Sequence, residues 1–512
     1  MSRTAEHNLP LLPLVLADVP DGLARALEQE GVPAEPFSPG SGQGRVVLFD
    51  SRARGRPGVE AGQVAVDVHR LRELFRHDPF VALGDEGSTR AAWALGPYRP
   101  TEEVARVDKR WVRWRLLAHL RSMVEDAGGI WIRLSSCPWP YQSALNFRID
   151  YDEYHPSDFR AVQDAMAGYE EATSHFVCGA SYESARGALA RLRGLDVGSH
   201  GYHHHTYRTV EENVTNIARG IDVLVRAGLQ PSGFAAPHGR FHRNLLKAAE
   251  TLGIEHSSEF GLAYDEVPFR PAAGGVLEVP VHPVCLGIVQ EAARAGKNGS
   301  PTDTPAAPAR AWVEHVRGFA DAQHRLGEPI FLYGHPTGRL GRYPQALAAV
   351  LHDTSNLPAV WKTTLAEFAR WWRFRIQVRL TVWLEHGSYV VKVERPPGPY
   401  RLAIRYYRGQ RMAVVPLEAE AVRFSPNALS YVCQPAELPQ RPVPLGRPGG
   451  LRHQLQRILD WETVTPFDEI PVNSWRNLAK RTLRLLWSTA IHRRLRPVQL
   501  STSRGGDRPP KG

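Results

Sequence analysis

The chain has 512 residues, of which 43% are hydrophobic and 23% charged; this balance excludes a globally disordered chain, a collagen-like repeat and a coiled-coil rod, and the length fits about three domains. Its four cysteines are far apart and form no CxxC pair, which argues against a disulfide scaffold or a thiolate zinc finger. Residues 471–512 hold ten Lys or Arg and one Asp and so contribute +9 of the net charge of +10. The rest of the chain is close to neutral and has no spread-out nucleic-acid footprint.

Residues 1–140 predict a small N-terminal α/β domain. Apolar runs at 11–16 and 46–50 are typical of strands, and an amphipathic helix is expected between them at 21–30. A second helix is expected at 108–126, with its apolar face toward the core. We assign no chemistry to this region.

Residues 144–372 alternate between short apolar runs and amphipathic stretches. The apolar runs are predicted strands, at 146–150, 175–178, 196–199, 233–236, 256–258 and 329–333. The amphipathic stretches are predicted helices, among them 158–169, 208–227 and 243–252. This alternation predicts a parallel sheet covered by helices, either open or closed into a barrel.

Residues 376–433 change to a period-two pattern, which predicts a C-terminal antiparallel β domain. Five prolines in 434–450 indicate a linker. Residues 451–512 are expected to form a basic helical tail with interleaved Trp and Leu. Such a tail suits an anionic membrane surface, and it suits equally a helix that packs its apolar side on the body. Nucleic acid is the less favoured partner because the body is near neutral.

No apolar run reaches the roughly 18 residues that a membrane-spanning helix needs. The apolar stretch 9–17 is short, contains two prolines and is followed by Asp18, so we interpret it as a strand and not as a signal peptide. We therefore expect a cytoplasmic protein, with the basic tail as a peripheral contact to the inner face of the membrane.

Two carboxylates follow the first predicted strand of the central region. Asp150 and Asp152 are separated by one residue, so both lie near the carboxyl edge of the predicted sheet, where α/β barrels build their active sites. A solvated acidic loop is the alternative, since carboxylates are mostly exposed.

Four histidines lie within residues 200–205, after the third predicted strand. His200 and His204 are spaced i, i+4, so on a helical turn both imidazoles point to one position, as in zinc hydrolases. His203 and His205 then serve packing or support. We favour a metal site over four structural histidines because the cluster ends a strand in the same region as the two aspartates.

Two further strand ends carry single candidates. The segment GFAAPHGR (233–240) combines small residues with a proline, which allows close approach of a ligand to the backbone. Taken alone, His238 and His335 each fit an ordinary loop histidine. Together with the aspartates and the histidine pair, His335 completes the parts of a metal-dependent hydrolase: three metal ligands, a carboxylate base and a late histidine that protonates a leaving amine.

These motifs resemble those of the NodB-type polysaccharide deacetylases (carbohydrate esterase family 4), over less than half of the chain. RIDYDEY is similar to the first motif of the family, SHGYHHH to its His-x-x-x-His motif and FLYGH to its final motif, and FAAPHGR stands in place of its Arg-x-Pro-x-Gly. The resemblance implies a distorted (β/α) barrel that binds a divalent metal, usually zinc. It also implies roles for individual residues: Asp150 as general base, His335 as general acid, Asp152, His200 and His204 as metal ligands, and Tyr151, Pro237, His238, Arg240 and Leu332 as substrate contacts.

Within this family, the motifs are most similar to a subgroup of lipid-linked aminoarabinose deformylases. The segment YDEVPFRP (264–271) is similar to the substrate-side loop of that subgroup. Asp265 and Arg270 are therefore candidate sugar or phosphate contacts, with an ordinary surface ion pair as the alternative.

One position departs from the family pattern, because Ala235 stands where most members carry an arginine that orients the base. Either Arg148 or Arg240 substitutes for it, or the base is tuned differently, or activity is reduced. We expect a metal-dependent hydrolase that removes an acetyl or formyl group from an amino sugar of a polysaccharide or lipid-linked glycan. The alternative is a non-catalytic glycan-binding or assembly protein on the same barrel.

Overall fold

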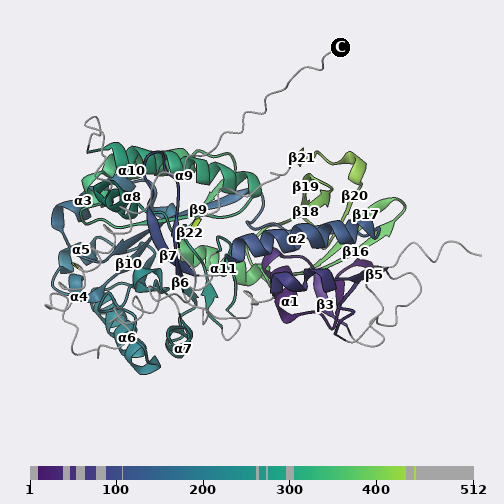
Figure 1. The fold of residues 1–512 in the computed structure, drawn as a ribbon, viewed down its shortest axis with the longest axis horizontal. Helices are drawn as coiled ribbons and strands as arrows, with labels where there is room; N and C mark the ends of the chain where they lie inside the picture. Colours follow the sequence, from purple (N-terminus) through teal and green to yellow (C-terminus); the bar gives the residue numbers. More distant parts are fainter. Residues whose placement is uncertain are drawn as a thin grey trace, which may run out of the picture.

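The structure is a computed structural model (Figure 1). It describes residues 10–37, 46–53, 64–75, 88–105, 108–240, 242–260, 265–271, 275–295, 305–433, 443–445 and 482. Apart from residue 482, the predicted basic tail lies outside these ranges, and so does most of the predicted linker. Among the helices of the described part, none is both long enough and apolar enough to cross a membrane.

The centre of the fold is a parallel sheet built around β9 (Ser143–Tyr151), whose nine residues are all buried. β9 pairs with three strands, β10 (Thr173–Val177), β14 (Ile330–Gly334) and β15 (Val360–Lys362). β10 pairs in turn with β11 (Val197–Ser199). These parallel strands alternate with helices along the chain, which confirms the strand and helix alternation predicted for the region.

Beyond β11 the sheet continues through short contacts. Phe234 forms single bridges to Ser199 and to Ser257, and β12 (His256–Ser257) pairs with β13 (Leu277–Glu278). The backbone N–H of His282 then donates to the carbonyl of Phe331 on β14, at 2.8 Å. The fold is therefore mixed α/β with a parallel sheet, and a complete distorted barrel stays a prediction.

The strand predicted at 233–236 is reduced to the single bridge residue Phe234. Two of the backbone groups that follow it are bound by side chains: the carbonyl of Ala235 pairs with His200 and the N–H of Ala236 with Glu259. Pro237 then has no N–H to offer a ladder.

Helices cover this sheet, as Figure 1 shows with α8, α9 and α10 along one side and α6 and α7 along another. Their bounds are α3 (Pro156–Met166), α4 (Gly179–Tyr182), α5 (Arg186–Ala190), α6 (Val210–Arg226), α7 (Arg243–Thr251), α8 (Leu286–Ala295), α9 (Ala307–Leu326), α10 (Pro344–Ser355) and α11 (Leu365–Arg375). The helices predicted at 158–169, 208–227 and 243–252 are confirmed. α6 begins at a capping box, in which Thr209 and Glu212 bind each other's backbone N–H groups.

The N-terminal region contains a second parallel sheet in the order β3-β2-β4-β5, with the predicted helix α1 (Asp21–Glu30). The strands are β2 (Leu14–Ala17), β3 (Ala34–Pro36), β4 (Val46–Phe49) and β5 (Val64–Asp67). The predicted second helix is α2 (Lys109–Asp126). In the sequence between β5 and α2, the strands β6 (Ser88–Ala92) and β7 (Thr101–Ala105) form an antiparallel hairpin. The β6 strand of this hairpin also pairs with β22 (Val443–Leu445).

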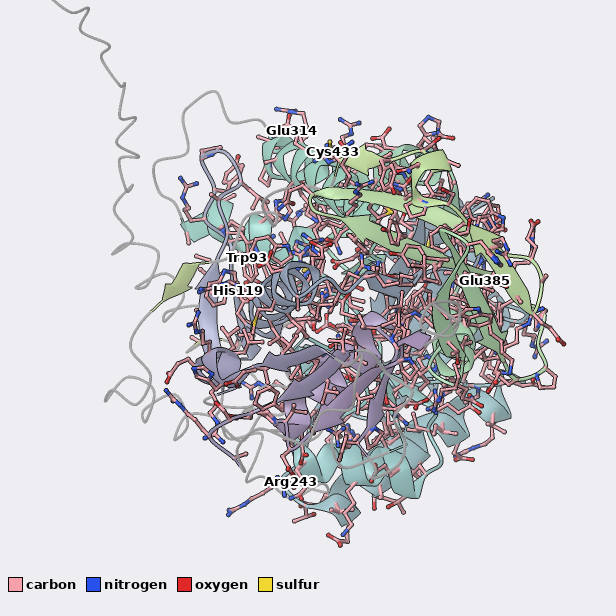
Figure 2. All side chains as sticks on the ribbon, turned by 90° about the vertical axis from the view of Figure 1, so that its right-hand side faces the viewer. Trp93, His119, Arg243, Glu314, Glu385 and Cys433 are labelled. Carbon is pink, nitrogen blue, oxygen red and sulfur yellow. The ribbon has the colours of Figure 1, made fainter. Side chains whose placement is uncertain are left out.

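The C-terminal region is antiparallel, as its period-two pattern predicts. Its strands are β16 (Arg379–Glu385), β17 (Ser388–Glu394), β18 (Leu402–Arg408), β19 (Arg411–Leu417), β20 (Ala421–Phe424) and β21 (Val432–Cys433). Two N-terminal strands complete its sheets: β1 (Pro10–Leu12) pairs with β16, and β8 (Trp131–Leu134) pairs with β18. Figure 2 shows the N-terminal and C-terminal strands on the same end of the molecule. The domain boundaries stay predictions, but the sheets are shared across them.

Candidate metal centre

The candidate site lies where the parallel strands end. Asp152 follows β9, His200 follows β11 and His335 follows β14 without an intervening residue. The last residues of β9, β10 and β11 pair in one row, Tyr151 with Val177 and Val177 with Ser199. Parallel strands present their carboxyl ends at one edge, so side chains far apart in sequence meet there.

Asp152, His200 and His204 bring their ligand atoms together. The Nε2 atoms of His200 and His204 lie 3.3 and 3.4 Å from Oδ1 of Asp152. All three ligand atoms lie within 4.8 Å of one another. His335 faces the second oxygen of the same carboxylate, with its Nε2 3.6 Å from Oδ2.

The orientation of His200 is fixed by the backbone. Its Nδ1 lies 2.7 Å from the carbonyl oxygen of Ala235, so Nδ1 carries the hydrogen and the lone pair of Nε2 points toward Asp152. A carbonyl partner on the second ring nitrogen is the usual support of a metal-binding histidine.

The atoms of this site fit a divalent cation. Among the described residues, Nε2 of His200 and Oδ1 of Asp152 are buried and have no hydrogen-bond partner. Buried polar atoms are normally paired, so two such atoms facing each other indicate a missing ligand. Two imidazole nitrogens and one carboxylate leave a coordination position open, as in catalytic zinc sites.

The two histidines converge through a bend and not through the expected helical turn. Residues 200–206 are not helical, and Gly201 has a φ of 79°, which favours glycine. Asn216 on α6 holds the bend, because its side chain accepts from the N–H of His203 and donates to the carbonyls of His203 and His205. The rings of His200 and His204 nevertheless lie close, with centroids 4.9 Å apart.

Electrostatics keep Asp152 charged. Burial opposes the charge, but the neighbouring histidines, His204 above all, outweigh burial and hold the pKa of Asp152 well below its usual range. Burial also opposes a charge on His200, and Asp150 and Asp152 more than reverse this, so the pKa of His200 is raised. At His335 burial dominates and lowers the pKa to about 3. Asp152 is thus a carboxylate at pH 7, and His335 is neutral.

Arg148 contacts the predicted base, and Arg240 does not. Nη2 of Arg148 lies 2.7 Å from Oδ2 of Asp150, and both side chains are almost fully buried. The other end of the guanidinium donates to the carbonyl and the hydroxyl of Ser258. Arg240 pairs instead with Glu103 on β7, at 3.1 Å.

A pair of buried carboxyl groups lies next to Arg148 and was not predicted from the sequence. Glu259 accepts from the N–H of Ala236 and from the hydroxyl of Ser257, both at 2.7 Å, and the N–H of Glu259 donates to Glu278 at 2.7 Å. Burial raises the pKa of both acids. Glu259 thereby holds the backbone next to Ala235, whose carbonyl orients His200. Only the charged residues within apolar strand runs could have indicated this pair.

The predicted substrate contacts occupy different positions. Tyr151 points into the core, where its hydroxyl contacts His175 at 3.0 Å and Gln163 at 2.7 Å, and Leu332 is also a core residue. Pro237 and His238 lie in a short turn, Pro237–Gly239. The His238 ring packs against the ring of His204, with centroids 4.4 Å apart.

Asp265 and Arg270 contact other parts of the molecule. Asp265 is fully buried and forms ion pairs with Lys109 and Arg113 of α2, both at 3.0 Å. Arg270 forms an ion pair with Glu28 at the surface. Among the interactions of the described residues, neither side chain bonds to Asp152, His200 or His204.

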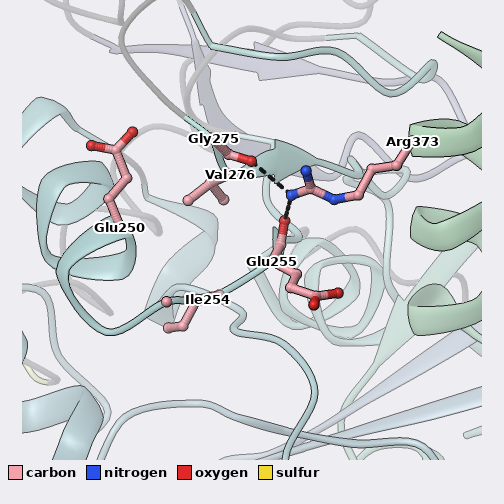
Figure 3. Close-up of a pocket in the computed structure, with 7 residues that line it drawn as sticks. Glu250, Ile254, Glu255, Gly275, Val276 and Arg373 are labelled. Carbon is pink, nitrogen blue, oxygen red and sulfur yellow. Dashed lines mark hydrogen bonds between the residues drawn. The ribbon is translucent and has the colours of Figure 1, made fainter. Parts of the chain in front are cut away.

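A hollow at the opposite edge of the sheet is lined by Glu250, Gly253, Ile254, Glu255, Gly275, Val276 and Arg373 (Figure 3). It lies before the first residues of β12 and β13. Arg373 of α11 donates there to the carbonyls of Glu255 and Gly275. The arginine therefore ties two strand starts together, at the edge away from the histidines.

Residues 146–257 match the family model described as Polysaccharide deacetylase. No curated protein matches the chain. This segment is therefore similar to the polysaccharide deacetylases, over less than a quarter of the chain. The match includes Asp150, Asp152, His200 and His204, and it ends before His335.

Several solved structures are similar to about half of the chain. A Mycobacterium smegmatis protein assigned to the polysaccharide deacetylases is 19% identical, with a TM-score of 0.39, over 46% of this chain and 93% of its own. A family 4 carbohydrate esterase from Streptomyces lividans, in complex with acetate, is 14% identical, with a TM-score of 0.29, over 43% of this chain and 92% of its own. A family 4 pseudoenzyme from Bacillus anthracis is 12% identical, with a TM-score of 0.32, over 44% of this chain and 65% of its own.

Proposed function

We propose that the protein is a metal-dependent hydrolase that removes an N-acyl group, acetyl or formyl, from an amino sugar of a glycan. The observation that carries this proposal is the convergence of Asp152, His200 and His204 within 4.8 Å at the carboxyl edge of the sheet. The family match of residues 146–257 supports the same chemistry. Zinc is the metal we expect, because imidazole and carboxylate ligands suit it.

Each residue near the metal position has a defined task. Asp152, His200 and His204 would hold the metal, which supplies Lewis acidity to the amide carbonyl and to the attacking water when bound. Asp150 takes the proton of that water as general base. Arg148 holds the Asp150 carboxylate in place, the task that the arginine missing at position 235 has in the family.

His335 is proposed to deliver a proton to the departing amine. Its Nε2 faces Asp152 at 3.6 Å, within the same site. Since burial lowers its pKa to about 3, the ring is neutral in the free protein. It therefore has to take up a proton during turnover before it can act as the acid.

The finer assignments are part of this proposal. The spaced aspartates and the small residues at 235–236 support a relation to the lipid-linked aminoarabinose deformylases, and a lipid-linked sugar would give the basic tail a role at the inner face of the membrane. A cytoplasmic location goes with this assignment. The three-region domain organisation, with 1–140 and 376–433 flanking 144–372, is proposed with it.

Metal content by mass spectrometry tests the proposal first. We expect about one zinc ion per chain in the wild type and none in His200→Ala/His204→Ala. The matched control is His119→Ala/His352→Ala, which removes two exposed histidines and should keep the metal. A wild type that stays metal-free after zinc is supplied would overturn the hydrolase and favour a non-catalytic glycan-binding protein.

Release of acetate or formate from N-acetyl and N-formyl amino sugars is the second measurement. We expect Asp150→Asn to keep the zinc and lose roughly 10²- to 10⁴-fold in kcat, the usual contribution of a general base. Unchanged turnover in this variant would remove Asp150 from the mechanism.

A further inference from the structure

We propose that the β6–β7 hairpin, outside the deacetylase-like segment, is an outer support of the metal centre: Glu103 holds Arg240, and thereby the turn that presses His238 against the metal ligand His204. The inference rests on the proposed metal centre. It gives a role at the site to a part of the chain to which the sequence assigns no chemistry.

The first link is an ion pair between two regions. Oε2 of Glu103 on β7 lies 3.1 Å from Nη2 of Arg240, and the two side chains are only 18% and 20% exposed. A charge pair this sheltered from water is screened less than a surface pair. It fixes the position of Arg240 relative to the hairpin.

The second link is the turn that precedes Arg240. Residues Pro237–Gly239 form a single short turn, in which His238 has a φ of 61° and Gly239 a φ of 62°. A left-handed conformation is unfavourable for a residue other than glycine, and it persists where surrounding contacts enforce it. Gly239 also has no room for a side chain, because a Cβ there would lie 2.3 Å from the ring of Phe260.

The third link joins the turn to the metal position. The rings of His238 and His204 meet edge to face, with centroids 4.4 Å apart and planes at 73°. His204 lies on the bend after β11 and is 24% exposed, whereas His200 is fully buried and bound to the Ala235 carbonyl. His204 is thus the more exposed of the two proposed histidine ligands, and the His238 ring is one of the groups that packs against it.

The hairpin is itself anchored on both sides. β7 contacts α8, and Glu102 lies near β14: burial raises the pKa of Tyr333 and of Cys285, and the Glu102 charge adds to both shifts. On the far side, β6 pairs with β22. The hairpin is therefore held by α8 and β22 while Glu103 pairs with the turn beside His204.

Zinc affinity, measured by competition with a chelator, tests this support without an activity assay. We expect Glu103→Gln and His238→Ala to raise the zinc Kd about 10-fold, the lower end of the effect of removing an outer-shell partner. The cobalt(II) absorption spectrum should shift in the same two variants. The charge-reversed pair Glu103→Arg/Arg240→Glu should bind zinc more tightly than either single reversal.

Glu28→Gln is the matched control, because Glu28 also pairs an N-terminal residue with an arginine of the central region, Arg270. Its zinc Kd should equal that of the wild type. A zinc Kd for Glu103→Gln within twofold of the wild type, with an unchanged cobalt spectrum, would overturn the inference alone. A wild type without zinc would instead refute the metal centre on which it rests. Thermal unfolding of each metal-free variant shows whether it is folded. If Glu103→Gln does not fold, the zinc Kd of His238→Ala decides whether the inference holds.

Discussion

Arg148 shows how a single residue can restore an interaction that the motif itself lacks. The methyl group of Ala235 cannot bind the carboxylate of the base. However, Arg148 lies on β9 two residues before Asp150, and residues two apart in a strand lie on one face. The arginine therefore reaches Asp150 from its own strand, at 2.7 Å. The sequence left Arg148 and Arg240 as alternatives because it does not place the 233–240 turn relative to β7.

Substitution of Arg148 should separate orientation of the base from metal binding. We expect Arg148→Lys to keep the zinc but to lower kcat by about 10-fold or more, because an ammonium group cannot bind Asp150 and Ser258 together as the guanidinium fork does. Arg240→Ala, assayed at saturating zinc, should keep kcat within a few-fold of the wild type. The kcat values and zinc contents of both variants check this prediction. A large kcat loss in Arg240→Ala alone, with zinc bound, would contradict it.

The sequence brings the three proposed metal ligands together because residue chemistry and strand position agree at each of them. His200 and His204 were expected to converge on a helical turn, and they converge through a bend held by Asn216 on α6. The spacing therefore predicts that these two rings lie close together, which they do, but the predicted helical turn is wrong. Tyr151 illustrates the opposite case: it lies between two site aspartates, but strand alternation turns its ring into the core.

At the scale of elements, α2 forms where it is predicted but buries charged side chains that its pattern does not predict. Its buried side chains include the expected Leu116 and Leu120, but also Lys109, Arg110 and Arg113 at its first turns. Their partners come from distant segments, among them Glu30 on α1, Asp265 and Glu328. Helical periodicity predicts that such basic residues lie on the solvent-exposed face of the helix. Their burial could not be predicted, because the acidic partners come from segments that are distant in the sequence.

Asp265 should therefore act on stability and not on substrate binding. We expect Asp265→Asn to lower the free energy of unfolding by roughly 3–5 kcal/mol, because it leaves buried cations with one counter-charge fewer. Arg270→Gln, which breaks an exposed pair, should cost about 1 kcal/mol or less. Chemical denaturation of the metal-free proteins checks both values. A changed KM with unchanged stability in Asp265→Asn would instead support a substrate contact.

The difference in the free energy of unfolding between wild type and Asp265→Asn should depend on pH. Burial opposes the charge on Asp265, but Arg113 and Lys109 outweigh it and hold the pKa of Asp265 below its usual range. Because the folded pKa lies below the unfolded value of about 3.9, the stabilisation is complete above about pH 4 and is lost as the pH falls further. The stability gap between wild type and Asp265→Asn should thus be constant near neutrality and shrink in acid. A gap that widens below pH 4 would contradict this assignment.

At the scale of the whole molecule, three sheets combine strands from the two ends of the chain. β1 extends the sheet of β16, β8 extends the sheet of β18, and β22 extends the β6–β7 hairpin. The local patterns predicted the strands of 376–433 and the class of each region. They could not predict these pairings, because strand alternation specifies which face is buried and not which distant edge becomes the neighbour.

The pairing of β22 with β6 makes the segment after residue 433 part of the site's support. In a chain that ends at residue 433, β6 loses the partners of Arg90, Ala91 and Ala92 and becomes an open edge. We expect its amides to exchange with solvent about 10-fold faster and the zinc Kd to rise, because the hairpin that holds Arg240 is less well anchored. A chain that ends at residue 450 keeps β22 and should behave like the full-length protein in hydrogen exchange and in zinc binding. If both truncated chains show the hydrogen exchange and the zinc Kd of the full-length protein, β22 does not support the hairpin. If both chains exchange faster and bind zinc more weakly to the same extent, residues beyond 450 are needed, and loss of β22 does not explain the effect.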